Sequence, residues 1–234
     1  MKNNPTKTIL ITGGNGGLGK SIANKLVQLN HRVIVTSRAF EPKYEDIVSD
    51  NRLIKQYLDV TDECSVKQLF TWLTTSNIKL DILINNAGIG VFKPLVEITL
   101  DEWNSVIATN LTGAFLCAKE ACKNMQVNGG GRIINIGSVA EKIPLPDNAV
   151  YGASKGALKI FSAILNEEAG HEKIRATHIT LGATYTDIWK TRLEFNKEDM
   201  LDPSLVADYI SYIALLPLSI RIDHVEILPE KGIL

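Results

Sequence analysis

A tyrosine and a lysine one helical turn apart are the first candidates for chemistry. Tyr151 and Lys155 lie four residues apart in a stretch with helical periodicity, so both side chains are expected on the same helix face. A free phenol has a pKa of about 10, and a nearby ammonium group favours the phenolate. The pair therefore predicts a tyrosine whose lowered pKa lets it donate or accept a proton near neutral pH.

A glycine-rich loop near the N-terminus predicts a phosphate site. An apolar run ends at Thr12, and an amphipathic helical pattern begins at Gly17. Glycines let the backbone turn sharply and approach a pyrophosphate closely, and the N-terminus of the following helix offers unpaired N–H groups and the positive end of its dipole. Strand, glycine loop and helix in this order favour a dinucleotide-binding unit.

The elements that must position these residues alternate along the whole chain. Short apolar runs predict strands at Thr8–Thr12, Arg32–Ser37, Leu53–Asp59, Leu80–Asn85, Arg132–Ser138, Ala176–Leu181 and His224–Leu228. Helical patterns cover Gly17–Leu29, Glu63–Thr74, Leu100–Met125, Tyr151–Ala169 and Ser204–Leu215. Continuous apolar strands separated by helices are typical of a parallel sheet buried on both faces. We predict a single α/β domain over residues 1–234, a Rossmann-like doubly wound parallel sheet of about seven strands with helices on both faces.

Composition and charge argue against several other classes. The 234 residues are 45% hydrophobic and 22% charged, with a formal net charge of −1, so we expect neither nucleic acid nor an anionic membrane as a partner. The N-terminus is short and polar, and no apolar run reaches about 18 residues, so we expect no secretory signal and no membrane span. Cys64, Cys117 and Cys122 form no CxxC pair, and no histidine cluster has zinc spacing. We therefore expect no metal, reduced thiols and a cytoplasmic protein.

The spacing of the glycine loop resembles that of the short-chain dehydrogenase/reductase family. Thr12, Gly13, Gly17 and Gly19 match its TGxxxGxG pattern, Asp59-Val60 matches its contact to the adenine ring, and Asn85-Asn86-Ala87-Gly88 matches its NNAG motif. The matches follow the family's order along nearly the whole chain. The resemblance implies a nicotinamide dinucleotide site formed by Gly13, Asn15, Gly16, Gly17, Leu18, Gly19, Asp59, Val60, Asn86, Ala87 and Gly88.

The same resemblance implies roles for four catalytic residues. Tyr151 would transfer the proton, and Lys155 would lower the tyrosine pKa and bind the nicotinamide ribose. Ser138, thirteen residues before the tyrosine, would hydrogen-bond the reacting oxygen. Asn110 would shape the backbone of the long central helix and support a water-linked proton relay through the lysine. An asparagine inside an otherwise apolar helix is unfavourable by propensity, which fits a compensating role.

The end of the second predicted strand indicates which cofactor is used. Family members that bind NAD place an acidic residue there for the ribose 2′-hydroxyl, and that residue would repel a 2′-phosphate. This chain has Ser37 followed by Arg38, and the planar guanidinium suits a phosphate. We expect NADP(H) as the cofactor rather than NAD(H).

The segment after the sixth predicted strand departs from the family in one position. Leu181 stands where a proline is usual, while Gly182, Thr184 and Thr186 keep the register of the family's nicotinamide contacts. Without the proline, the backbone turn is expected to be less rigid. Residues 182–203 mix aromatic and charged side chains at the carboxyl edge of the sheet, where α/β folds place substrate-binding elements. We interpret them as the substrate loop.

The substrate is expected to be a small-molecule carbonyl or the corresponding alcohol. The residues predicted to line its pocket are mostly apolar: Ile89, Val91, Ala140, Leu145, Val150, Tyr185 and Trp189. The helices Leu100–Met125 and Tyr151–Ala169 carry more apolar positions than one sheet face needs. These positions, Phe115, Leu116, Leu158, Phe161 and Leu165, predict a homodimer or homotetramer.

Two functions other than carbonyl reduction are also considered. The first is a non-catalytic NADP(H)-binding regulatory protein that has kept the fold; the intact set of Asn110, Ser138, Tyr151 and Lys155 argues against it. The second keeps the enzyme but runs it toward alcohol oxidation, and cofactor choice separates the two directions only weakly.

Overall fold

One parallel sheet runs through the part of the chain that the computed structural model describes, residues 5–42, 51–186 and 196–233. Its strands are β1 (Thr8–Thr12), β2 (Arg32–Ser37), β3 (Leu53–Tyr57), β4 (Ile82–Asn85), β5 (Gly131–Ile136), β6 (Ile174–Leu181) and β7 (His224–Ile227). They follow the order β3-β2-β1-β4-β5-β6-β7, and every neighbouring pair is parallel. The predicted doubly wound α/β fold is confirmed.

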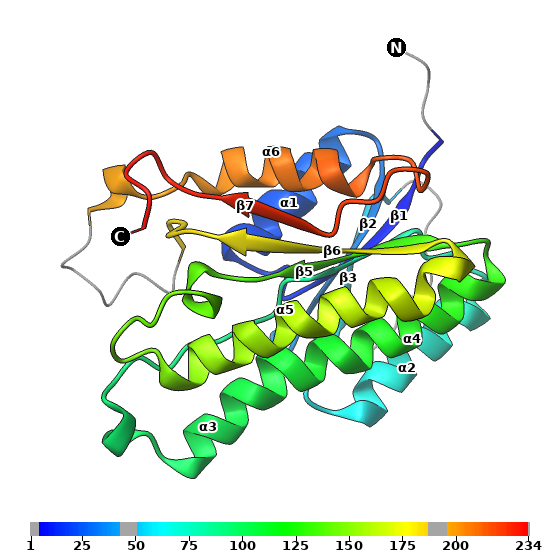
Figure 1. The fold of residues 1–234 in the computed structure, drawn as a ribbon. Helices are drawn as coiled ribbons and strands as arrows, with labels where there is room; N and C mark the ends of the chain where they lie inside the picture. The colour runs from blue at the N-terminus through cyan, green and yellow to red at the C-terminus, as the bar shows by residue number, and fades with distance from the viewer. Residues whose placement is uncertain (1–4, 43–50, 187–195, 234) are drawn as a thin grey trace.

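Helices cover both faces of the sheet (Figure 1). They are α1 (Gly17–Gln28), α2 (Glu63–Thr75), α3 (Leu100–Ile107), α4 (Gly113–Val127), α5 (Ala149–Ala169) and α6 (Pro203–Ala214). Helices α1 and α6 pack over alternate strand residues such as Ile9 and Ile11, and α2 and α4 pack over the opposite set, which includes Leu10. The central strands β1 and β4 are buried along their whole length and are mostly apolar, whereas the edge strands β3 and β7 carry exposed polar side chains such as Lys55 and His224.

Side chains at the helix starts explain where several helices begin. Asp62 caps α2 by accepting from the backbone N–H of Cys64, and Thr99 and Glu102 form a reciprocal capping box at α3. Asp202 caps α6. Helix α1 differs, because Gly16 precedes it in an extended conformation and no side chain caps it. The first N–H groups of α1 therefore have no side-chain acceptor at the helix start.

The central helix is interrupted where the sequence predicted one continuous element. The predicted Leu100–Met125 helix is divided into α3 and α4 by a π-helical turn, η2 (Ala108–Thr112), which contains the buried Asn110. Such π turns are rare and often lie at functional sites. The apolar periodicity continues through the turn, so the sequence pattern did not reveal it.

Strands β1 and β2 have the predicted bounds, while β3 and β5 end two residues earlier than predicted. Asp59 and Ser138 therefore lie in the loops that follow these strands. The strand order turns back between β1 and β4, so the loops after these two strands diverge and leave a crevice at the carboxyl edge. The glycine loop and the NNAG motif both open onto this crevice.

Candidate active site

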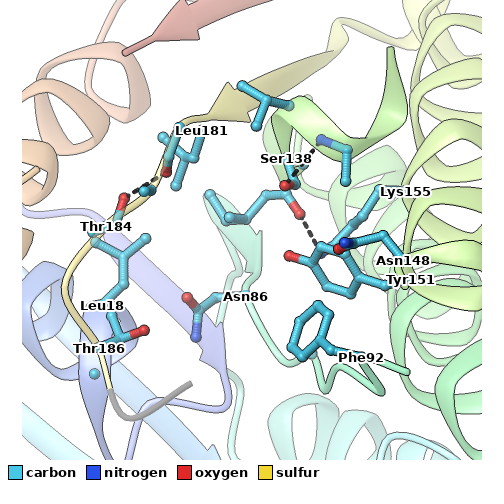
Figure 2. Close-up of a pocket in the computed structure, with 18 of the residues that line it drawn as sticks. Leu18, Asn86, Phe92, Ser138, Asn148, Tyr151, Lys155, Leu181, Thr184 and Thr186 are labelled. Atoms are coloured by element: carbon cyan, nitrogen blue, oxygen red, sulfur yellow. Dashed lines mark hydrogen bonds between the residues drawn. The ribbon is translucent and has the colours of Figure 1, made fainter. Parts of the chain in front are cut away.

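A cavity of about 570 Å³ opens at the carboxyl edge of the sheet. Figure 2 shows Leu18, Thr184 and Thr186 on one side of it and Ser138 and Tyr151 on the other. Thirteen residues that the sequence assigned to the site line this cavity. They are Gly13, Gly16, Gly17, Leu18, Asn86, Ala87, Gly88, Ser138, Tyr151, Lys155, Gly182, Thr184 and Thr186.

The glycine loop has the backbone geometry of a phosphate cradle. Gly17, the first residue of α1, has φ +50°, a conformation that favours glycine. A Cβ at Gly19 would lie 2.5 Å from Nδ2 of Asn86 and 2.6 Å from the carbonyl oxygen of Gly13, so only glycine fits there. The loop thus presents backbone rather than side chains to the cavity, in front of the uncapped start of α1. This arrangement fits the pyrophosphate of a dinucleotide.

The NNAG motif braces the glycine loop. The hydroxyl of Thr12 accepts from the backbone N–H of Asn86 (3.1 Å) and of Ala87 (3.0 Å). Nδ2 of Asn86 donates to the carbonyl oxygens of Thr12 (3.0 Å) and Gly13 (3.1 Å). Four hydrogen bonds therefore join the loops after β1 and β4 across the crevice, which fixes the shape of the cradle.

Tyr151 is half-buried and faces the cavity from the first turn of α5. The ring of Phe92 packs edge-on against it, with 5.4 Å between ring centroids. Burial raises the pKa of Tyr151, and a hydrogen bond with Ser138 acts in the opposite direction. The lowered pKa predicted from the sequence is therefore wrong for the phenol in these surroundings, because loss of hydration disfavours the phenolate more than its neighbours favour it.

Lys155 is buried one helical turn from the tyrosine. Its ammonium group donates to the carbonyl oxygen of Ile136 at 2.7 Å and lies 5.7 Å from the centroid of the Tyr151 ring. Burial lowers the pKa of Lys155 to about 8, although the negative charge of Glu141 acts in the opposite direction. The predicted shared face of Tyr151 and Lys155 is confirmed.

Asn110 is tied to two other segments by its amide. It accepts from the backbone N–H of Ile89 (2.8 Å) and donates to the Ile89 carbonyl (2.9 Å) and to the Ser154 hydroxyl (3.0 Å). A Cβ at Gly88 would lie 3.4 Å from Oδ1 of Asn110 and 3.6 Å from Nζ of Lys155. The amide and the ammonium group therefore both lie close to Gly88.

The other residues assigned to the cofactor lie outside the cavity lining. Asn15 is exposed, and Gly19 is buried beneath the loop. Ser37 accepts from the backbone N–H of Ala39 in the turn after β2, where Arg38 is exposed. The carboxylate of Asp59 accepts from Thr61, and Val60 packs against Gly113. Ser37, Arg38, Asp59 and Val60 follow β2 and β3, beside the glycine loop at the same edge of the sheet.

The position where leucine replaces proline is held by the sheet. Leu181 is the last residue of β6 and pairs with Ile227 of β7, and the N–H of Gly182 donates to the Ile227 carbonyl at 2.9 Å. The hydroxyl of Thr184 donates to the carbonyl of Gly182 at 3.1 Å. Strand pairing and this local hydrogen bond thus restrain the turn that a proline would otherwise stiffen.

The substrate side of the cavity was predicted less well than the cofactor side. Ala140 and Leu145 line it as expected, but Ile89, Val91, Val150 and Tyr185 do not, and Trp189 lies outside the described residues. Sequence reasoning missed Phe92, Pro146 and Asn148, which do line it. Asn148 lies three residues before the predicted helix start at Tyr151 and directly precedes α5, which begins at Ala149. An asparagine just before a helical pattern was the available signal.

From the sequence, we also expect no metal site and no membrane span. Within residues 5–42, 51–186 and 196–233, no group of histidine, cysteine and acidic side chains could hold a metal ion. In the same part of the chain, no helix is long and apolar enough to cross a bilayer.

Comparison with known proteins agrees with this geometry. The family model described as short chain dehydrogenase matches residues 7–197. The NADP-dependent 3-hydroxy acid dehydrogenase YdfG of Escherichia coli (strain K12) is 29% identical over 94% of both chains. The closed form of a serine dehydrogenase complexed with NADP+ is 27% identical over 96% of both chains, with a TM-score of 0.86. ElxO with NADP bound is 27% identical over 95% of this chain and 98% of its own, with a TM-score of 0.81. This chain belongs to the short-chain dehydrogenase family.

Proposed function

We propose that this protein is an NADP(H)-dependent oxidoreductase that interconverts a carbonyl and an alcohol, with Tyr151 as the acid/base residue. One observation carries the proposal. Ser138, Tyr151 and Lys155 line the same cavity as the glycine loop, and Asn110 lies directly behind them. A proton-transfer group thus faces the cradle expected for a hydride-carrying dinucleotide.

Each residue has a specific part in the proposed reaction. When bound, the nicotinamide cofactor supplies or accepts the hydride. The phenol of Tyr151 donates its proton to the carbonyl oxygen during reduction, and the phenolate accepts the hydroxyl proton of the alcohol during oxidation. Ser138 hydrogen-bonds that oxygen, and Lys155 supplies a positive charge beside the phenol. Asn110 holds the π turn and the loop after β4 together through its two bonds to Ile89.

The cofactor assignment has independent support from relatives and from the turn after β2. Both the E. coli 3-hydroxy acid dehydrogenase and the serine dehydrogenase are described with NADP. In this chain Ser37 and the exposed Arg38 occupy the turn where an acidic residue would disfavour a 2′-phosphate. Arg38 is the proposed 2′-phosphate contact. Asp59 and Val60 are the proposed neighbours of the adenine ring.

The proposed substrate is a small-molecule carbonyl or alcohol. The side of the cavity near Tyr151 is lined by Phe92, Val139, Ala140 and Leu145, which favour an apolar substituent beside the reacting carbon. We propose residues 182–203 as the substrate loop of a single domain that spans residues 1–234. Its cofactor-proximal part, Thr184 and Thr186, borders the cavity.

The protein is further proposed to form a homodimer or homotetramer in the cytoplasm. Leu116 and Leu158, two of the positions predicted to face a partner subunit, are instead buried in the core. Exposed apolar side chains of α4 and α5 include Phe115, Ile160 and Ile164, which are 43%, 62% and 49% exposed. Such a surface favours pairing with a second copy. The free cysteines fit a reducing compartment.

A panel of ketones, aldehydes and alcohols tests the proposal directly. Reduction is followed by loss of NADPH absorbance and oxidation by its appearance, each measured with NADP(H) and with NAD(H). We expect turnover with at least one carbonyl class and a higher kcat/KM with NADPH than with NADH. Tight NADPH binding without turnover of any member would instead favour the non-catalytic reading.

A further inference from the structure

A buried carboxylate lies directly behind Ser138. Glu141 ends a short helical turn, η3 (Val139–Glu141), which Ser138 caps. Its side chain is 0% exposed, and its Oε2 accepts from the backbone N–H of Ser138 at 3.3 Å. Glu141 does not line the cavity, and nothing in the proposed reaction uses it.

The carboxylate is held by donors from two other elements, β6 and α5. Nε2 of His178, on β6, lies 2.7 Å from Oε2, and the hydroxyl of Thr180 donates to Oε1. Nζ of Lys159, on α5, lies 3.2 Å from Oε1. Burial by itself would raise the pKa of Glu141, but these hydrogen bonds outweigh burial and hold the pKa at about 2. Glu141 is therefore ionised at every pH at which an enzyme of this kind would work.

Histidines extend this cluster toward the edge of the sheet. Nε2 of His224, on β7, lies 2.7 Å from the Thr180 hydroxyl, and its ring stacks on that of His178 with 6.0 Å between centroids. Lys142 pairs with Glu226 on the exposed side. The charged and titratable groups that face Glu141 are thus Lys159, His178 and His224, with Tyr151 and Lys155 on the cavity side.

Gly137 makes room for the pair of Glu141 and His178. A Cβ at Gly137 would lie 2.6 Å from Oε2 of Glu141 and would overlap Nε2 of His178. Any other residue would push the two side chains apart. The residue next to Ser138 is therefore fitted to a buried carboxylate–imidazole contact.

We propose that Glu141 is a positioning residue of the active site, whose buried charge fixes Ser138 and keeps the phenol of Tyr151 in its protonated, proton-donating form. This inference rests on the proposed function, because the protonated phenol matters only if Tyr151 transfers a proton. A negative charge disfavours formation of a nearby phenolate. In agreement, Glu141 acts to raise the pKa of Tyr151.

The consequence concerns the pH range of each direction of the reaction. Reduction requires the phenol, so a higher pKa extends efficient reduction to more alkaline pH. Oxidation requires the phenolate, so a higher pKa moves the rise in oxidation rate to higher pH. The equilibrium between carbonyl and alcohol is unchanged, because a catalyst does not alter it. The glutamate thus extends the pH range of reduction on its alkaline side.

Direct titration of Tyr151 tests the inference without turnover. Protein labelled with ¹³C at the ζ carbon of tyrosine gives a signal for each of six tyrosines, and Tyr151→Phe identifies the signal of interest. In Glu141→Gln, which keeps the shape but removes the charge, we expect the titration midpoint of Tyr151 to move to lower pH. Glu226→Gln removes the same charge at a 29% exposed side chain, and we expect no shift.

A second variant covers the case in which Glu141→Gln does not fold. Lys159 is 36% exposed, so Lys159→Met is well tolerated, and removing its positive charge should move the Tyr151 midpoint to higher pH. An unchanged midpoint in folded Glu141→Gln overturns the inference. If that variant does not fold, an unchanged midpoint in Lys159→Met overturns it.

Kinetics then separate positioning from the charge effect. For Glu141→Gln we expect the alkaline limb of the reduction profile to move to lower pH with the midpoint, and the KM for NADPH to stay within about twofold. For Glu141→Ala, which also frees Ser138, we expect kcat to fall about tenfold or more. If Tyr151 titrates as expected but the wild-type protein reduces no carbonyl, the proposed function is contradicted. If the wild-type protein reduces a carbonyl but the titration midpoint of Tyr151 is unchanged in Glu141→Gln, only this inference is contradicted.

Discussion

Asn110 and Ile89 exchange two hydrogen bonds between the π turn and the loop after β4, at 2.8 and 2.9 Å. Asn110 lies in η2, the π turn between α3 and α4. Its third bond, to Ser154 on α5, joins the loop after β4 to the helix that carries Tyr151 and Lys155. Asn110 therefore organises three segments of the site, whatever part it takes in proton transfer.

Replacing Asn110 by alanine should lower the free energy of unfolding as well as the rate of turnover. The change leaves a buried hydroxyl and two backbone groups without their partner, at a cost of about 3 kcal/mol in the free energy of unfolding. Denaturant unfolding followed by circular dichroism measures this loss. Asn104→Ala, on the exposed side of α3, is the matched control and should change the free energy of unfolding by less than about 0.5 kcal/mol. Equal stability of the two variants would contradict the bracing role.

Local pattern explains why so much of the fold was predictable. Strand β1 has an apolar centre, Ile9–Ile11, and ends just before the glycines of the loop, so its bounds could be predicted from neighbouring residues. The π turn was not predicted. It contains Asn110, which bonds a loop twenty-one residues away, and a local pattern does not show such a contact. The apolar periodicity of the helix is the same with or without that contact.

In the site, too, the features set by neighbouring residues were predicted and those set by distant contacts were not. The glycine loop could be predicted from the spacing of its own residues, and the pair of Tyr151 and Lys155 from their spacing on one helix. The structure brings both to the same cavity. Glu141 and His178 lie 37 residues apart, match no motif and meet only because β6 passes behind η3. The pKa of Tyr151 was predicted in the wrong direction because the sequence gives the neighbouring cation but not the depth of burial.

Tyr151→Phe should remove turnover and leave cofactor binding nearly unchanged. The substitution deletes one hydroxyl, which supplies the proton, while the ring can still pack against Phe92. We expect kcat to fall by about 10²–10⁴-fold, with a Kd for NADPH, from fluorescence titration, within about threefold of wild type. Tyr212→Phe, at a tyrosine that is 68% exposed on α6, is the control. Turnover near the wild-type rate would exclude Tyr151 as the proton donor.

The buried Lys155 should make stability depend on pH in a defined window. Its folded-state pKa of about 8 is below the ordinary value of 10.5, so the unfolded state binds more protons between these values and the free energy of unfolding rises with pH there. Between about pH 7.5 and about pH 9.5, wild type should gain about 2 kcal/mol relative to Lys155→Met. Urea unfolding of both proteins at each pH measures the difference. A difference that does not change with pH would mean that Lys155 titrates as an exposed lysine.

Arg38→Ala tests the choice of cofactor. If the guanidinium contacts the 2′-phosphate, its loss should raise the Kd for NADPH about tenfold or more, as expected for a charge-assisted hydrogen bond. The Kd for NADH should change by less than about twofold, because NADH has no phosphate at that position. Arg52, whose side chain bonds Asn30 at the amino end of β3, provides the control Arg52→Ala. A preference for NADH in wild type would refute the assignment before any variant is made.

Two glycines of the loop should respond differently to a methyl group. At Gly19 the added Cβ would lie 2.5 Å from Nδ2 of Asn86 and 2.6 Å from the Gly13 carbonyl oxygen, so Gly19→Ala should destabilise the free protein by about 1–3 kcal/mol. At Gly16 no atom lies within 4 Å of the added Cβ and the backbone is extended, so Gly16→Ala should keep the wild-type Tm.

Because Gly16 lines the cavity, the same methyl group should hinder the approach of a pyrophosphate and weaken NADPH binding. Thermal unfolding with and without NADPH measures both effects: Gly19→Ala lowers the Tm of the free protein, whereas Gly16→Ala reduces only the rise in Tm that NADPH produces. An undiminished rise in Gly16→Ala would show that the phosphates bind elsewhere.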